Sequence, residues 1–305
     1  MSQKDGTGAQ VQRYASVFAA ASLIKTNFKH KSLAKIDVNP GDSFSSTRDV
    51  DEFIRKLNQI LSETFQKSVQ EENTFAKELK FAKDSNLFYL SALLFSFVSY
   101  FTKKSFLLEV ENCYRICGLY PESFRTFGDK FQVKVNSLSE KSFQSSLVNF
   151  HIRAFNLGTS NHVSSLSADR LISVGESILK NFDNFNFNIH TDVNPSSTQL
   201  DLIDSETSKE TLMYWQSFGF DYSERGFEVL ENEVKKVLIM FQNHGIQSSI
   251  ITGINPLEFW KSTINSKIFV MAHSSLSFIT AISMRDAVIY VPKSWPFKLE
   301  AWIEY

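Results

Sequence analysis

The sequence predicts an α/β protein whose second half is built on a parallel β-sheet. From about residue 140 onward, short apolar runs alternate with longer amphipathic segments, the order that right-handed β–α–β crossovers produce. Before that point, the long segments carry apolar residues at helical spacing. Hydrophobic residues make up 43% of the chain, and 29 residues are phenylalanine, so both halves have material for a buried core.

The length and the charge of the chain limit its possible domain organisation and its possible partners. A chain of 305 residues is longer than a typical single domain, and the change in character predicts two domains, 1–142 and 143–305. The 32 basic and 33 acidic residues nearly cancel, which leaves no overall field to attract nucleic acid. No nucleic-acid partner is therefore expected.

The first half is expected to be rich in helices. Residues 8–28 follow a glycine-containing turn and carry apolar residues at helical spacing. Residues 46–69 form a second such segment, with Asp49 favourably placed in its first turn. We interpret residues 105–120 as a further helix that closes this half.

The longest apolar run, residues 87–101, bears on membrane association and localisation. Serines interrupt it, and it is shorter than the roughly 18 to 20 residues that cross a bilayer, so it predicts a buried helix. A role at a membrane surface is the alternative. The N-terminus lacks the apolar core of a signal peptide, and Cys113 and Cys117 share one helical face without the further ligands of a zinc site. These features predict a cytoplasmic protein without a metal or a transmembrane segment.

The second half alternates strands and helices in sequence order. Strands are expected within 145–156, 185–193, 247–253, 267–274 and 286–292, and helices within 168–182, 226–245, 255–266 and 275–285. This order predicts a Rossmann-like sheet with helices on both faces, in which ligands bind at the carboxyl ends of the strands. The features that fall at those ends are His151, Arg153, Asp192, Gly253 and the stretch 272–275 (AHSS).

Two of the motifs suit anion binding. Gly6 and Gly8 let the backbone approach a phosphate at the start of a helix, although a flexible terminal turn explains them as well. His151 and Arg153 point to one side of a strand, where a guanidinium grips two phosphate oxygens. An arginine that merely pairs with a carboxylate is the alternative.

Two further strand ends carry polar residues. His273, Ser274 and Ser275 lie between a strand and a helix, where hydroxyls and free N–H groups form a phosphate-binding nest or an ordinary helix cap. Asp192 ends a strand, where it holds a base edge or a ribose hydroxyl, or only makes a turn. His190, in the same strand, is interpreted as a residue that fills space.

Taken in order, four of these stretches resemble the α-1,2-fucosyltransferases and the wider group of GDP-fucose-dependent transferases. The stretches are GTGAQVQR, HIRAFN, HTD and MAHSSLSF, which correspond to a glycine turn with Gln, H-x-R-R-G-D, S-D-D and S-x-S-S-F-S in that group. The tail from residue 251 to 295 is the best match. The resemblance covers most of the chain and is least supported over residues 50–140.

The resemblance implies a GT-B architecture, with two Rossmann-like domains facing a cleft. The acceptor would bind largely to the helix-rich domain 1–142, and the donor nucleotide sugar, GDP-fucose, to 143–305. It implies inverting, metal-independent transfer to a glycan acceptor, without a cofactor besides the donor substrate. Arg153, assisted by His151, would then neutralise the leaving diphosphate.

The resemblance also assigns the remaining site residues. The donor-binding set would be Gly6, Gly8, Gln10, Arg153, Asp192, His273, Ser274, Ser275 and Ser277. An inverting transfer needs a base near the acceptor hydroxyl, for which His30 and Asp42 are candidates.

The chain departs from the family pattern directly after Arg153. Ala154, Phe155 and Asn156 stand where the family has Arg-Gly-Asp, and Leu276 replaces the aromatic residue of S-S-F-S. The anion-binding part of the pattern is thus retained better than the sugar-recognition part. Two alternatives follow: a transferase that uses a different nucleotide sugar, and a non-catalytic relative that binds a nucleotide or a sugar.

Overall fold

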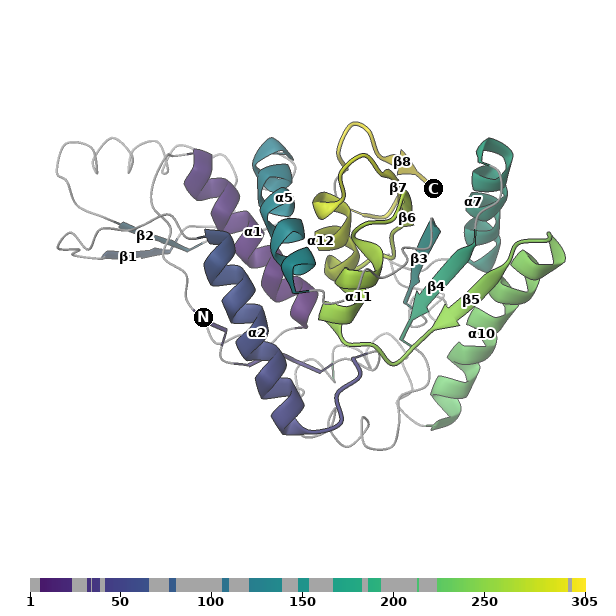
Figure 1. Ribbon diagram of the computed structural model, residues 1–305, viewed down its shortest axis with the longest axis horizontal. Helices are drawn as coiled ribbons and strands as arrows, with labels where there is room; N and C mark the ends of the chain where they lie inside the picture. The colour runs from purple at the N-terminus through teal and green to yellow at the C-terminus, as the bar shows by residue number, and fades with distance from the viewer. Residues whose placement is uncertain are drawn as a thin grey trace.

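The computed structural model describes residues 6–23, 32–33, 35–38, 42–65, 77–80, 106–109, 121–138, 148–153, 167–182, 186–192, 213, 224–295 and 298–305. The helices of these residues are α1 (Thr7–Leu23), α2 (Thr47–Phe65), α5 (Pro121–Ser137), α7 (Ala168–Asn181), α10 (Glu224–Asn243), α11 (Pro256–Thr263) and α12 (Ser275–Ser283) (Figure 1). The strands are β1 (Lys77–Lys80), β2 (Phe106–Glu109), β3 (Val148–Ile152), β4 (Phe187–Thr191), β5 (Ser248–Ile251), β6 (Ile268–Val270), β7 (Val288–Val291) and β8 (Ile303–Glu304).

A six-stranded sheet organises the second half. Its strands are all parallel and run in the order β5-β4-β3-β6-β7-β8. Counted along the chain, this is the order 3-2-1-4-5-6 that is common among doubly wound sheets. The prediction of an α/β fold with a parallel, Rossmann-like sheet is confirmed.

Helices cover both faces of the sheet (Figure 1). On one face, α7 and α10 bury a cluster in which the rings of Phe150, Phe187 and Phe241 lie 5.2–5.4 Å apart. On the other face lie α11 and α12. Because both faces are buried, the central strand β6 is apolar at successive positions, and all three of its residues are buried.

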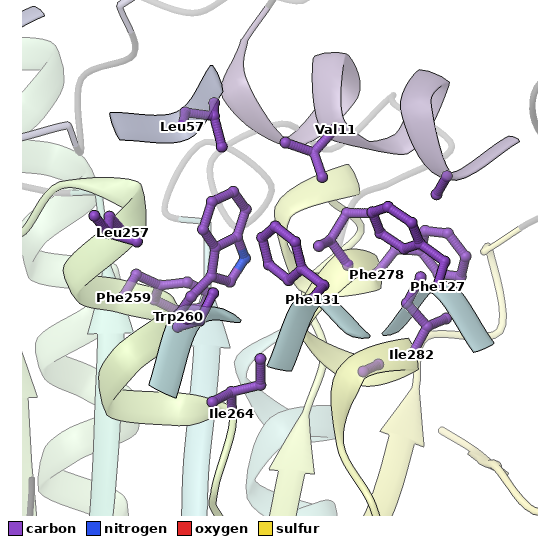
Figure 2. Close-up of a cluster of buried hydrophobic side chains, with 14 of the residues drawn as sticks. Val11, Leu57, Phe127, Phe131, Leu257, Phe259, Trp260, Ile264, Phe278 and Ile282 are labelled. Atoms are coloured by element: carbon purple, nitrogen blue, oxygen red, sulfur yellow. The ribbon is translucent and has the colours of Figure 1, made fainter. Parts of the chain in front are cut away.

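Three helices of the first half, α1, α2 and α5, form a further layer over α11 and α12 (Figure 1). Figure 2 shows the aromatic contacts that hold this layer, in which the ring of Phe131 lies 5.0 Å from that of Trp260 and 5.7 Å from that of Phe127. The cluster of buried side chains therefore draws on both halves of the chain. The predicted boundary between residues 142 and 143 lies outside the described residues and stays a prediction.

Local sequence signals set the ends of several helices. Ser167 caps α7, where its hydroxyl accepts the amide of Arg170, as expected from a serine before an amphipathic run. Asn255 and Glu258 form a reciprocal capping box at the start of α11. At the end of α10, Gly245 has a φ of 75° and the amide of Ile246 bonds to the carbonyl of Phe241, the Schellman arrangement that favours glycine.

The structure differs from the predicted elements in three places. The helix α5 was not predicted, because Gly128 and several β-branched residues weaken its helical signal until it packs on α12. The strand β8 has only two residues and gives no pattern. Residues Phe106–Glu109 form the strand β2, paired in parallel with β1, where a helix was predicted; an apolar run this short does not distinguish the two.

Two other predictions concern residues outside the described part of the chain. These are the buried helix at 87–101 and the shared helical face of Cys113 and Cys117. Among the helices that the structure describes, none is long and apolar enough to span a membrane.

Candidate functional site

The candidate site lies at the carboxyl ends of β3 and β6, the two central strands of the sheet. From β3 the chain continues outward to β4 and β5, and from β6 it continues the other way to β7 and β8. The connections therefore diverge between β3 and β6. In open α/β sheets, this switch point is where a crevice forms and ligands bind.

Two rows of polar side chains lead up to this point on the face that α11 and α12 cover. Alternation along β3 places Asn149, His151 and Arg153 on that face, opposite the apolar side chains of the same strand. The parallel register sets His151 beside His190 of β4. When this register is continued by two residues, Arg153 lies beside Asp192.

Both histidines of this ladder are buried and neutral. The Nε2 atom of His190 lies 2.9 Å from Oδ1 of Asn149, and the ring of Phe259 covers His190 and His151 at 5.3 Å and 4.7 Å. Burial lowers the pKa of His190 from 6.5 to about 3. For His151, burial first, and then the charge of Arg153 and the neighbouring His190, hold the pKa well below its usual range. His151 therefore adds no positive charge to the site at neutral pH.

The hydroxyl of Ser277 links His151 to the turn after β6. Its Oγ accepts the amide of Ala272 at 3.0 Å and lies 2.5 Å from Nδ1 of His151. Ser277 is fully buried, and its hydroxyl lies between His151 and the amide of Ala272.

Arg153 carries the positive charge of the site. Its Nε lies 3.4 Å from Oδ2 of Asp192, and the two side chains are 25% and 13% exposed. Within the described part of the chain, neither terminal nitrogen of the guanidinium has a hydrogen-bond partner. An arginine held through Nε keeps its two terminal nitrogens available to bind an anion through two parallel hydrogen bonds.

The start of α1 packs directly against the start of α12. A Cβ atom added to Gly8 would lie 2.3 Å from the backbone nitrogen of Leu276, so only glycine allows this approach. Ser274 caps α12 through its hydroxyl, which accepts the amide of Leu276 at 3.2 Å. Two helix N-termini, each with a positive partial charge, therefore meet beside the end of β3.

Other predicted site residues surround this junction. Gln10 is buried in the first turn of α1, where its backbone N–H donates to the backbone carbonyl of Gly6. Ser275 is half-buried at the first position of α12. The Nδ1 atom of His273 lies 2.9 Å from the hydroxyl of Ser294, so this histidine joins the turns after β6 and β7.

The two candidate bases have different outcomes. Asp42 is 6% exposed, and the hydroxyl of the adjacent Ser43 lies 3.9 Å from the position of a Cβ on Gly253, which follows β5. Asp42 thus lies near the carboxyl edge of the sheet, on the β5 side. His30 lies outside the described residues, as do Ala154, Phe155 and Asn156.

Sequence reasoning missed three polar residues near the glycine turn. Asp37 is fully buried and pairs through its backbone with Gly6, in an alternating stretch (Ile36, Asp37, Val38) that hints at a strand-like segment. Thr7 and Gln12 are buried on α1, and Oγ1 of Thr7 and Nε2 of Gln12 have no partner among the described residues. No sequence signal marks either one.

No cluster of three or more histidine, cysteine or acidic residues able to hold a metal occurs in the part of the chain that the structure describes. None of the protein-family models, curated proteins or solved structures compared with this chain matches it. The chemistry of the site therefore has to be argued from its own residues.

Proposed function

We propose that the chain is a glycosyltransferase that transfers L-fucose from GDP-fucose to a glycan acceptor. One observation carries the proposal: Gly8 of the glycine turn packs on the N-terminus of α12, beside the strand end that presents Arg153. Three stretches that are far apart in the sequence thus meet at the switch point of a doubly wound sheet. The same three stretches carry the resemblance to the GDP-fucose-dependent transferases.

The charges of this arrangement suit a leaving diphosphate. In an inverting transfer, the acceptor oxygen attacks the anomeric carbon, the bond from that carbon to the diphosphate oxygen breaks, and its electron pair stays on GDP. A base takes the proton of the attacking hydroxyl. The guanidinium of Arg153 and the N-termini of α1 and α12 would stabilise the charge that develops on the diphosphate, without a metal.

The proposal extends to the GT-B organisation. The donor would bind at the carboxyl edge of the six-stranded sheet. The acceptor would approach from the side of residues 1–142, whose helices α1, α2 and α5 pack over α11 and α12. Asp42, buried on the β5 side of that edge, is the described candidate for the base.

A nucleotide panel tests the donor. In a thermal-shift assay with GDP, UDP, ADP, GDP-fucose and GDP-mannose, GDP and GDP-fucose should raise the melting temperature most. Arg153→Ala should abolish that rise. Arg285→Ala, which removes an exposed ion pair with Asp129, serves as the control and should keep it. Stabilisation by UDP-sugars alone, or an unchanged response of Arg153→Ala, contradicts the proposal.

The second candidate is a non-catalytic relative that binds a nucleotide or a sugar. The observation that favours it is the sequence Ala154, Phe155, Asn156 in place of Arg-Gly-Asp, which leaves Arg153 without the neighbouring arginine. Incubation with GDP-fucose and a panel of glycan acceptors separates the two functions. Release of GDP that depends on an acceptor supports the transferase, whereas binding of GDP without any release supports the non-catalytic relative.

A further inference from the structure

The role of Asp192 follows from the ion pair in which the structure places it. The family resemblance assigns this residue to the nucleoside. In the structure, its carboxylate lies 3.4 Å from Nε of Arg153, at the point where the register of β3 and β4 brings the two residues side by side. The ion pair is therefore a product of the strand pairing.

Only one edge of the guanidinium takes part in this pair. The carboxylate meets Nε, while the terminal nitrogens have no partner within the described residues. A free arginine side chain loses conformational freedom when it is fixed, and an anchor at Nε meets part of that entropy cost before a ligand arrives. The fork then points its remaining donors away from Asp192.

Within the part of the chain that the structure describes, Asp192 is the group that pairs with this guanidinium. The residues directly beneath it, His151 and His190, are buried and engaged with Ser277 and Asn149. Neither supplies a carboxylate. The Asp that follows the arginine in the family motif is absent here, because Asn156 stands at that position.

The geometry points to Asp192 as a positioning residue for Arg153: it holds the guanidinium through Nε so that the two terminal nitrogens face the diphosphate. This inference rests on the proposed function, since it names the diphosphate as the ligand of Arg153. It assigns Asp192 to the phosphate end of the donor.

Two substitutions and two ligands distinguish this role from its alternatives. Asp192→Ala removes the anchor, and Asp192→Asn keeps an oxygen that accepts the Nε hydrogen. Isothermal titration calorimetry with GDP and with inorganic pyrophosphate should show that Asp192→Ala weakens both ligands by a similar factor, about fivefold or more. Asp192→Asn should weaken them less than twofold. Asp129→Ala, which breaks an exposed arginine pair elsewhere, should change neither affinity.

The alternatives predict other patterns. If Asp192 acts only through its charge, both variants bind pyrophosphate more tightly than the wild type, because a negative charge near the anion is removed. If it holds the nucleoside, both variants lose affinity for GDP and keep that for pyrophosphate. Either pattern, or an unchanged affinity of Asp192→Ala for pyrophosphate, overturns the inference. A wild-type protein that binds neither ligand overturns the proposed function and the inference with it.

A spectroscopic measurement on the ligand-free protein gives an independent readout. The Nε–H proton of Arg153 should give a resonance protected from exchange with water, identified by its loss in Arg153→Lys. Protection should be lost in Asp192→Ala and retained in Asp192→Asn. Equal protection in all forms that contain Arg153 contradicts the anchoring.

Discussion

At the scale of single residues, burial decides which groups of the site carry charge. His151 and His190 sit side by side in the sheet and beneath one aromatic ring, so both stay neutral at pH 7. Arg153, directly after the end of β3, is partly exposed and is the cationic side chain of this ladder. The positive charge of the ladder is thus confined to the end of the strand, where a ligand has access.

The buried state of His190 makes the stability of the protein depend on pH. Its pKa is about 3 in the folded chain and near 6.5 in the unfolded one, so between these values the unfolded chain binds the extra proton. Stability is therefore fully present above pH 6.5 and is lost as the pH falls toward 3. When the pH falls from 7.5 to 5, protonation of this residue in the unfolded chain should alone lower the free energy of unfolding by roughly 2 kcal/mol. His151 acts in the same direction.

Urea unfolding at the two pH values measures this dependence. In His190→Gln, the difference between pH 7.5 and pH 5 should shrink by about 2 kcal/mol. Phe127→Leu, in a cluster where the ring packs on Phe131 rather than on either histidine, removes no titrating group, so it should lower stability equally at both pH values. Retention of the full pH dependence by His190→Gln would contradict the neutral, buried state.

Gly8 is the residue that allows α1 and α12 to meet. In Gly8→Ala, the new methyl group would lie 2.3 Å from a backbone nitrogen that cannot turn aside, so α1 has to move away from α12. We expect the free energy of unfolding to fall by about 1–3 kcal/mol. Under the proposed function, we also expect the variant to lose its affinity for GDP under conditions in which it is still folded. Ala9→Ser, at the half-buried neighbouring position, is the matched control and should retain both. Normal GDP binding by Gly8→Ala would remove the glycine turn from the donor site.

At the scale of elements, two glycines set how closely helices pack. Gly128 brings α5 onto α12, and an added Cβ would lie 1.9 Å from the carbonyl oxygen of Ile282. Gly175 brings α7 onto α10, where the Cβ would lie 2.5 Å from an atom of the Phe241 side chain. The first contact is with backbone, and the second is with a ring that has some freedom to shift.

The nature of the neighbour predicts the order of the two effects. Gly128→Ala should lower the free energy of unfolding by more than about 3 kcal/mol, and Gly175→Ala by about 1–3 kcal/mol. These are net values, because alanine also stabilises each helix by up to about 1 kcal/mol through its higher helix propensity. Urea unfolding of both variants measures the order. A larger loss for Gly175→Ala would contradict the close approach of α5 and α12.

Elements whose signals are local could be predicted from the sequence, and those that depend on tertiary packing could not. Ser167 and the amphipathic run after it predict α7 closely, because cap and periodicity agree. The helix α5 has Gly128 at a close crossing, and that crossing is visible only when α12 is in place. For the same reason, a strand and a helix remained indistinguishable at Phe106–Glu109.

The candidate site follows a similar division. Alternation along a predicted strand placed His151 and Arg153 on one face, and the carboxyl end of another predicted parallel strand placed Ser274 and Ser275 at the same edge of the sheet. The contacts themselves depend on register and loop geometry: His151 meets Ser277 across 126 residues of sequence, and Arg153 meets Asp192 across 39. Ser277, which the resemblance assigns to the donor site, is fully buried in the structure, and no sequence pattern predicted that burial.

At the scale of the whole molecule, one buried cluster joins the helices of the first half to the second half. The ring of Phe131, from α5, packs edge-on against Trp260 of α11, and Trp295 and Trp302 belong to the same cluster. Three of the four tryptophans therefore report on a core to which both halves contribute, and the fourth, Trp215, lies outside the described residues. Two independently stable domains would instead keep separate cores and unfold separately.

The shared cluster predicts a single unfolding transition for the described layers of helices and sheet. Circular dichroism and tryptophan fluorescence should give the same midpoint in urea. Phe131→Ala should shift both by the same amount, equivalent to about 3–5 kcal/mol, because it opens a cavity against Trp260. Val133→Ala, on the same helix but 61% exposed, should change stability by less than about 0.5 kcal/mol. If the two probes separate in Phe131→Ala, the helices of the first half unfold without the sheet, and the cluster does not couple the two halves.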